Sequence, residues 1–297
     1  MNRHTFGYQQ VMHASPETVD RPIAVVTGAS SGIGRETARQ LADHGFHVVL
    51  VARRAEELQR TLDLIGGRGS MIVCDMADTQ QVEAVAEQIH TQFGRCDALI
   101  NNAGVGTDVM MTDHAGPEAL DHLMRVNFLS AARLTNRLLP DLRAAAATLR
   151  GGMRAASIVN ISSVAGLMGL PTASIYCSTK FAFTGWSQGL HAELHRDGIR
   201  VACVHPGPVP TEGWPHEDVR GQWYRPLAAS TVQRVARLIV RQVVRGRGNP
   251  APVIPVGYRA TVLLATIMPW AVRGVLRNAR YSKRMSYVGE SHAHLGK

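Results

Sequence analysis

The feature that most constrains this chain is a regular alternation of two sequence textures. Short runs rich in β-branched residues, most of them ending in a glycine or a small polar residue, are separated by longer helical stretches. Continuous apolar strands that alternate with helices predict a parallel sheet covered on both faces, an α/β doubly wound or Rossmann fold. The runs are "IAVVTG" (23–28), "HVVLVA" (47–52), "SMIVCD" (70–75), "DALINN" (97–102), "ASIVNIS" (156–162) and "IRVACVHPG" (199–207).

The same pattern divides the chain into three parts. Residues 1–20 lack it and are predicted to be a flexible extension without the apolar run of a signal peptide. Residues 21–255 carry all six runs and form one Rossmann-fold domain, while 256–297 form a basic, amphipathic helical tail. No stretch has the roughly 20 uninterrupted apolar residues of a membrane span. We expect a cytoplasmic protein.

Charge and cysteine usage narrow the function classes. The net charge is +9, but residues from 221 onward carry +12 and the preceding part carries −3, so the basic character belongs to the C-terminal quarter. That quarter lacks the interleaved aromatics of a nucleic-acid-binding surface. The four cysteines are scattered, which predicts free thiols in a reducing compartment and neither a zinc site nor a disulfide framework. They are Cys74, Cys96, Cys177 and Cys203.

A glycine-rich turn follows the first predicted strand. "VVTGASSGIGRE" places Gly28, Gly32 and Gly34 in the pattern TGxxxGxG at the start of a helix. Glycines allow the backbone to turn tightly and to approach a pyrophosphate, which meets the free N–H groups of the helix. The turn predicts a dinucleotide site that also includes Ser30, Ser31 and Ile33.

The end of the second predicted strand indicates which dinucleotide is bound. NAD sites usually have an acid there, but this chain has Arg53 and Arg54. A guanidinium binds a 2′-phosphate, so the pattern favours NADP(H), with Arg35 as a further source of charge. The alternative is that these arginines are simply solvated.

Tyr176 and Lys180 stand four residues apart in "YCSTK". On a helix this spacing places both side chains on one face, within reach of a common ligand. A phenol and an ammonium suit proton transfer, and the positive charge would favour the phenolate. The alternative is a surface tyrosine beside a solvated lysine.

Taken in order, these motifs make residues 21–255 resemble the short-chain dehydrogenase/reductase family. The matching pieces are TGASSGIG (27–34), "CDMAD" (74–78), NNAG (101–104), "VN" (126–127), "NISS" (160–163), Tyr-x-x-x-Lys (176–180) and "PGPVPT" (206–211). The resemblance implies hydride transfer between NADP(H) and a carbonyl compound or secondary alcohol.

The same resemblance implies four catalytic residues. Tyr176 would be the general acid/base, and Lys180 would assist it and bind the nicotinamide ribose. Ser163, preferred over its neighbour Ser162, would orient the substrate carbonyl. Asn127 would hold a water in the proton relay.

Further cofactor contacts are implied in the same way. Asp75 would bond the adenine amine, Asn101 and Gly104 would line the path of the ribose and phosphates, and Val209 and Thr211 would hold the carboxamide. Pro210 between the last two is a mild departure, because proline has no backbone donor. The remaining positions are Met76, Ala103, Pro206 and Gly207.

Two questions stay open at this level. The chain could instead be a non-catalytic NADP-binding regulatory or scaffold protein, although such relatives typically lose the tyrosine or lysine. The substrate is expected to be hydrophobic, because the segment after Thr211 carries Trp214, Trp223 and Tyr224, which equally well could pack a lid.

Two expectations concern partners. The family resemblance implies a homodimer or homotetramer, with the helix that carries Tyr176 at the contact through Phe181, Phe183, Trp186 and Leu190. Residues 257–286 begin apolar and end basic, with Pro269 between two short segments. They are expected to touch a membrane surface without spanning it, or to pack on their own domain or partner subunit.

Overall fold

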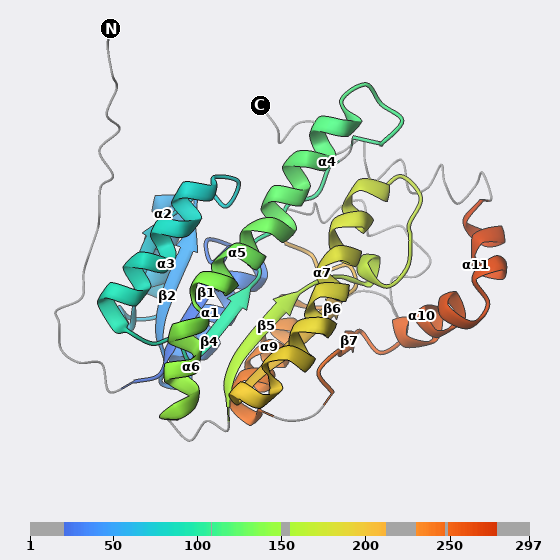
Figure 1. The fold of residues 1–297 in the computed structure, drawn as a ribbon. Coiled ribbons are helices and arrows are strands. Elements are labelled where there is room, and N and C mark those ends of the chain that lie inside the picture. Colours follow the sequence, from blue (N-terminus) through green and yellow to red (C-terminus); the bar gives the residue numbers. More distant parts are fainter. Residues whose placement is uncertain (1–20, 108, 150–154, 212–229, 247–248, 278–297) are drawn as a thin grey trace, which may run out of the picture.

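A computed structural model of the chain describes residues 21–107, 109–149, 155–211, 230–246 and 249–277 (Figure 1). Its centre is a seven-stranded parallel sheet with the order β3-β2-β1-β4-β5-β6-β7. The predicted doubly wound fold is confirmed. The predicted extension (1–20), the aromatic segment 212–229 and the end of the tail (278–297) lie outside the described residues.

All six predicted runs form strands, with ends that differ by at most two residues. The seventh strand was not predicted, because "NPAPVIP" (249–255) is short and rich in proline. The strands are β1 (Ile23–Thr27), β2 (His47–Ala52), β3 (Gly69–Val73), β4 (Ala98–Asn101), β5 (Ala156–Ile161), β6 (Ile199–Pro206) and β7 (Val253–Ile254).

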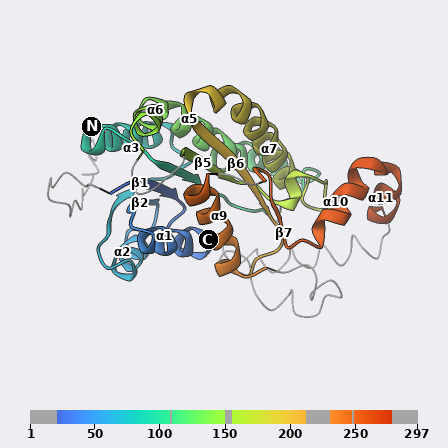
Figure 2. The same ribbon diagram turned by 90° about the horizontal axis from the view of Figure 1, so that it is seen from below.

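Helices cover both faces of the sheet (Figure 2). On one face lie α1 (Gly32–Asp43), α2 (Ala55–Leu64) and α9 (Val232–Arg245). On the other lie α3 (Thr79–Phe93), α5 (Ser130–Arg137), α6 (Leu139–Ala147) and α7 (Ser174–Leu194). The remaining elements are α4 (Gly116–Met124), the π-helical turn η1 (Arg125–Leu129), the 3₁₀ turns η2 (Val164–Gly166) and η3 (His195–Asp197), α10 (Tyr258–Ile267) and α11 (Pro269–Leu276).

The alternation of side chains along the strands explains why helices are needed on both faces. On β1, Val26 packs into the core cluster under α1 and α9, whereas its neighbour Val25 packs into the cluster under α3 and α5. All five residues of β1 are buried. A strand that is apolar on both faces must be covered on both faces.

The chain order creates a switch point in the sheet. From β1 the chain builds outward through β2 and β3, then returns to β4 and builds outward in the other direction. Strand β1 is therefore paired with β2 on one side and β4 on the other. Parallel strands bring their carboxyl ends to one edge, and ligands bind there at the switch point.

The sheet ends in a short, proline-rich edge. The backbone N–H groups of Cys203, His205 and Gly207 donate to the carbonyls of Pro250, Pro252 and Ile254. The chain then enters α10 and α11, which lie beyond β7 in both views (Figures 1 and 2). As expected, Pro269 separates two short segments. Within the described residues, none of the helices combines the length and apolar character that crossing a bilayer requires.

Helix α7 carries the four apolar residues expected either at a subunit contact or in the core of the domain. Phe183 and Leu190 are buried in the core, and Trp186 stacks on the Phe183 ring with centroids 5.7 Å apart. Of the four residues expected at a contact, Phe181 is largely exposed. The helix uses most of its apolar side chains against its own sheet.

A buried ion pair joins strands at the opposite, amino edge of the sheet. The Asp97 carboxylate accepts a 2.8 Å bond from the backbone N–H of Ile23 and bonds of 2.9 and 2.6 Å from the Arg95 guanidinium. Asp97 is fully buried and Arg95 nearly so. This carboxylate therefore fixes the start of β1 beside the start of β4.

We expect Asp97→Asn to lower the free energy of unfolding by about 3 kcal/mol, because it leaves a buried guanidinium without its counter-charge. Asp43→Asn is the matched control. Asp43 pairs with Arg39 and Arg68 at the surface, so its loss should cost less than about 1 kcal/mol. Urea unfolding of both variants measures the difference, and equal effects would contradict the assignment.

Candidate active site

The glycine turn between β1 and α1 has no room for larger residues. Gly28 has φ +67°, and a Cβ there would lie 2.9 Å from Asn102 Nδ2 and 3.0 Å from Ala103 Cα. A Cβ on Gly34 would lie 2.2 Å from the Gly28 carbonyl oxygen. Ser31 precedes α1, and its side chain does not cap the helix. The first N–H groups of α1 are therefore left for a ligand.

Two residues without an assigned role from the sequence hold this turn in place. The hydroxyl of Thr27 accepts 3.0 Å bonds from the backbone N–H groups of Asn102 and Ala103. The Asn102 amide donates to the Thr27 carbonyl at 2.9 Å. Thr27, the first residue of TGxxxGxG, and Asn102, the second asparagine of NNAG, thus join the ends of β1 and β4. Each lies in a motif, but their pairing depends on the strand order.

The arginines at the end of β2 surround the same turn. Arg54 donates to the Ser30 hydroxyl at 3.4 Å. Arg35 donates to the Ser30 carbonyl and forms a 2.5 Å ion pair with Glu57. The guanidinium of Arg53 is exposed and has no ion-pair partner within the described part of the chain. The charge of Arg35 is therefore partly neutralised by Glu57, whereas Arg53 is exposed at the end of β2.

The residues after β3 and β4 that are predicted to contact the dinucleotide differ in how deeply they are buried. Asp75 follows β3 and accepts a 3.0 Å bond from Ala77 N–H. The side chains of Met76 and Asn101 are buried. Asn101 donates to Thr135 at 3.0 Å and to Asn160 at 2.9 Å. The side chains of Met76 and Asn101 thus pack inside the protein, and the prediction that these two positions line the dinucleotide site rests on their backbone.

Asn127 lies in the π-helical turn η1 and faces the end of β4. Its amide exchanges two bonds with the backbone of Val105, at 2.8 and 2.9 Å, and donates to Thr179 at 3.1 Å. A single π turn inside a helix is often found at a functional site. A Cβ on Gly104 would lie 3.4 Å from both Asn127 Oδ1 and Lys180 Nζ. These three predicted site residues therefore converge.

Tyr176, Lys180 and Ser163 also lie together. Lys180 Nζ is 5.7 Å from the centre of the Tyr176 ring and donates to the Ile161 carbonyl at 3.0 Å. Ser163 precedes η2, where its hydroxyl accepts from Ala165 N–H at 3.1 Å. Ser162 instead faces inward and bonds the Lys180 carbonyl at 3.1 Å. The structure brings Ser163, rather than Ser162, toward the tyrosine.

Burial dominates the protonation of this pair. It raises the pKa of Tyr176 to about 12, although a hydrogen bond with Ser163 acts in the opposite direction. It lowers the pKa of Lys180 to about 8. The net effect on Tyr176 is a raised pKa, so burial outweighs the stabilisation of the phenolate that Lys180 is predicted to give. The ammonium is directed to a backbone carbonyl, and the cost of burying a phenolate is larger than its attraction to that charge.

A polar cluster behind Lys180 fixes its turn of α7. The Thr184 hydroxyl donates to the Lys180 carbonyl at 2.8 Å and lies 2.9 Å from the Ser162 hydroxyl. His205 Nε2 is 3.4 Å from Thr184 Oγ1 and 3.5 Å from Cys203 Sγ. Burial lowers the pKa of His205 to about 4, although a hydrogen bond to the Pro252 backbone acts in the opposite direction. The imidazole is therefore neutral near pH 7.

The loop after β6 closes the site against the glycine turn. Ser163 donates to the Pro206 carbonyl at 3.4 Å, and Gly207 is held by β7. A Cβ on Gly32 would lie 3.1 Å from Thr211 Cγ2. Val209 is buried in the core beneath the loop. The predicted carboxamide loop thus lies beside the predicted phosphate turn.

These observations fit a dinucleotide. The glycine turn leaves a cradle that a Cβ would fill, the start of α1 offers N–H groups for phosphate, and Arg53 lies at the end of the neighbouring strand. The described residues contain no cluster of ligands suited to a metal ion.

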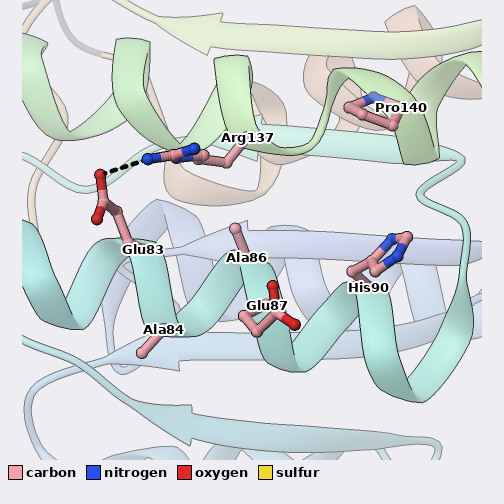
Figure 3. Close-up of a pocket in the computed structure, with 7 residues that line it drawn as sticks. All are labelled: Glu83, Ala84, Ala86, Glu87, His90, Arg137 and Pro140. Carbon is pink, nitrogen blue, oxygen red and sulfur yellow. Dashed lines mark hydrogen bonds and ion pairs between the residues drawn. The ribbon is translucent and has the colours of Figure 1, made fainter.

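A separate groove of about 560 Å³ lies between α3 and the α5–α6 corner (Figure 3). It is polar, with a 3.0 Å ion pair between Arg137 and Glu83. None of the predicted site residues lines it. It lies on the outer helix layer and is not the candidate active site.

The family model for short chain dehydrogenase matches residues 22–218. The chain is 36% identical over 185 residues to a 3-ketodihydrosphingosine reductase of Bacteroides thetaiotaomicron, covering 62% of this chain and 63% of that protein. It is 33% identical over 195 residues to dehydrogenase/reductase SDR family member 7 of Mus musculus, covering 63% and 55%. The matched part thus spans less than two thirds of each of these relatives.

Solved structures share the architecture. A metagenomic short-chain oxidoreductase in complex with NADP is 28% identical, with a TM-score of 0.64, over 78% of this chain and 96% of that one. A short chain dehydrogenase/reductase from Burkholderia phymatum in complex with NAD is 25% identical, with a TM-score of 0.70, over 84% and 94%. The two neighbours hold different dinucleotides.

We expect acid to destabilise the fold through His205. Its folded pKa is about 4 and its unfolded value is about 6.5, so the unfolded chain binds the proton more tightly between these pH values. The free energy of unfolding should fall by up to about 3 kcal/mol from pH 6.5 to 4. In His205→Gln this fall should be smaller by that contribution. Urea unfolding over the pH range measures it, and parallel curves would contradict the assignment.

Proposed function

Because the chain belongs to the short-chain dehydrogenase family, whose members use nicotinamide dinucleotides, we propose that it transfers a hydride between NADP(H) and a carbonyl compound or secondary alcohol. The convergence of Asn127, Lys180 and Gly104 beside Tyr176 carries this proposal. The reaction reduces a carbonyl to an alcohol, or the reverse.

The preference for NADP(H) rests on charge at the end of β2. Arg53 is exposed there, Arg54 bonds the phosphate turn through Ser30, and no acid occupies the first three positions after the strand. A carboxylate at this position would repel a 2′-phosphate, whereas a guanidinium binds it. Solved relatives hold NADP in one case and NAD in another. The side chains at this strand end therefore decide between the two.

The proton chemistry follows from the burial of the site. The bound nicotinamide supplies or accepts the hydride. Tyr176, protonated at neutral pH because its pKa is about 12, donates its proton to the oxygen of the substrate carbonyl. Ser163 holds that oxygen, and the Lys180 ammonium, whose pKa is about 8, stabilises the phenolate that remains. A protonated Tyr176 serves the reductive direction, and a deprotonated Tyr176 serves oxidation.

The substrate class is proposed to be hydrophobic. Two relatives are named for reduction of a keto group, 3-ketodihydrosphingosine in one and 3-oxoacyl-[acyl-carrier-protein] in the other. Met110 and Met111, in the loop between β4 and α4, are exposed apolar side chains. The assembly remains a prediction of a homodimer or homotetramer, which light scattering would decide.

A non-catalytic NADP-binding regulator or scaffold is the alternative. It would need the dinucleotide cradle but not the proton donor. The presence of Asn127, Ser163, Tyr176 and Lys180 in one cluster favours the enzyme. NADPH oxidation with a panel of ketones and aldehydes of graded size separates the two.

Tyr176→Phe removes the titrating hydroxyl and keeps the shape of the ring. We expect the rate of ketone reduction to fall by at least about 100-fold, the scale of general acid catalysis. NADPH should still bind, as measured by quenching of its fluorescence. Near-full turnover by the variant would rule out Tyr176 as the proton donor.

Arg53→Ala should weaken NADPH binding by about 1.5–3 kcal/mol, the cost of a lost charge-assisted hydrogen bond, and leave NADH binding nearly unchanged. The matched control is Arg60→Ala, which removes an exposed arginine that pairs with Glu57 on α2. Titration calorimetry with both nucleotides measures the effect. Equal weakening of NADPH and NADH would show that Arg53 does not read the 2′-phosphate.

A further inference from the structure

Helices α10 and α11, with Met268 between them, carry six of the 14 exposed large apolar side chains among the described residues. We call residues 258–276 the C-terminal arm. No side chain of α10 is buried. Leu263, Ile267, Trp270 and Val275 expose 58%, 62%, 71% and 63% of their surface. Water-exposed apolar groups on two successive helices indicate a surface that binds something.

The charge on the arm has one sign. Residues 257–277 contain Arg259, Arg273 and Arg277 and no acid. The sequence from there to the end adds four basic residues and a single acid, Glu290. A partner that matches this surface therefore has negative charge on its outside and an apolar layer below that charge.

We propose that the C-terminal arm docks the protein on an anionic lipid surface. The apolar side chains enter the boundary between headgroups and acyl chains, while the arginines reach the lipid phosphates. The arm lies in the interface rather than across the bilayer, because Pro269 divides it into helices of 10 and 8 residues. A helix that spans a bilayer needs about 20 residues.

The charge also argues against a second copy as the occupant. In a symmetric dimer the same patch faces itself, so the arginines of one arm would approach those of the other. Like charges across an interface are unfavourable. An anionic lipid surface meets both the apolar and the positive groups of the arm.

Docking would bring the candidate active site to the lipid. Strand β7 ends at Ile254, whose carbonyl accepts a 2.7 Å bond from Gly207 N–H, and the arm begins four residues later. The arm is therefore rooted at the carboxyl edge of the sheet, beside the loop predicted to hold nicotinamide (Figures 1 and 2). In so far as the proposed function holds, the substrate class is carbonyl compounds dissolved in the bilayer.

The full-length protein should float with vesicles of phosphatidylcholine and phosphatidylserine, and less with vesicles of phosphatidylcholine alone. The triple variant Leu263→Ser/Ile267→Ser/Trp270→Ser should bind at least about tenfold more weakly, because it removes the apolar contacts. Its matched control is Leu64→Ser/Val73→Ser, which removes exposed apolar groups at the opposite edge of the sheet. That variant should bind like the wild type.

A second pair tests the charge. Arg259→Gln/Arg277→Gln should weaken binding to the anionic vesicles by roughly fivefold for each arginine removed. Arg237→Gln/Arg241→Gln removes two exposed arginines of α9 and should have little effect. If both double variants lost the same amount of vesicle binding, the attraction would come from the overall charge of the protein. The proposal that the arm is the binding site would then be overturned.

The docking proposal fails if the wild type stays with the soluble fraction on both vesicles, or if the triple variant floats as the wild type does. It also fails if the triple substitution instead reduces the mass of the protein in light scattering, because the arm would then bind a second copy.

An apolar ketone dissolved in the vesicles should be reduced several-fold faster by the wild type than by the triple variant, and a short water-soluble ketone equally by both. If neither ketone is reduced while the wild type floats, the proposed function is wrong and the docking stands.

Discussion

Strands β1 and β4 meet at their carboxyl ends so closely that a Cβ on Gly28 would contact both Asn102 and Ala103. The Thr27 hydroxyl and the Asn102 amide fix this approach with three hydrogen bonds of 2.9 to 3.0 Å. The positions of the other parts of the site depend on this contact between the two strands. The start of α1 faces the switch point because the turn is tight, and Val105 after β4 is hydrogen-bonded to Asn127. The end of β2 lies beside the turn because β2 pairs with β1.

At the reacting end of the site Lys180 is buried and Tyr176 is half-buried. Tyr176 and Lys180 titrate in the direction that burial imposes, and each shift opposes the charged form. The cluster of Ser162, Thr184 and His205 holds the backbone of α7 at Lys180 without adding a charge, because the imidazole is neutral. A neutral support adds no charge beside the Lys180 ammonium, which lies 5.7 Å from the centre of the Tyr176 ring. Burial thus keeps the proton on the phenol, and it also raises the free energy needed to release that proton.

The sequence predicted the sheet because β-branched runs with no polar face can be satisfied only between two helix layers. It placed the glycine turn and the Tyr176–Lys180 pair because each depends on spacing within one element. It could not show that Arg35 pairs with Glu57, that Asn101 bonds Thr135 and Asn160, or that Lys180 donates to Ile161. Those contacts join residues 19 to 59 positions apart and arise only after the strands are ordered. Strand β7 escaped prediction because two of its flanking residues, Pro252 and Pro255, are typical of loops.

The prolines that flank β7 affect whether the sheet edges of two copies of the chain can pair. Residues 250–254 cover the N–H groups of β6 with the carbonyls of Pro250, Pro252 and Ile254. Pro250, Pro252 and Pro255 have no N–H of their own, so the outward side of this segment has few donors for another strand. A paired strand of only two residues adds little length for such a contact. The sheet therefore ends in a border that resists edge-to-edge growth, which protects a chain with an exposed apolar arm from assembling into β-aggregates.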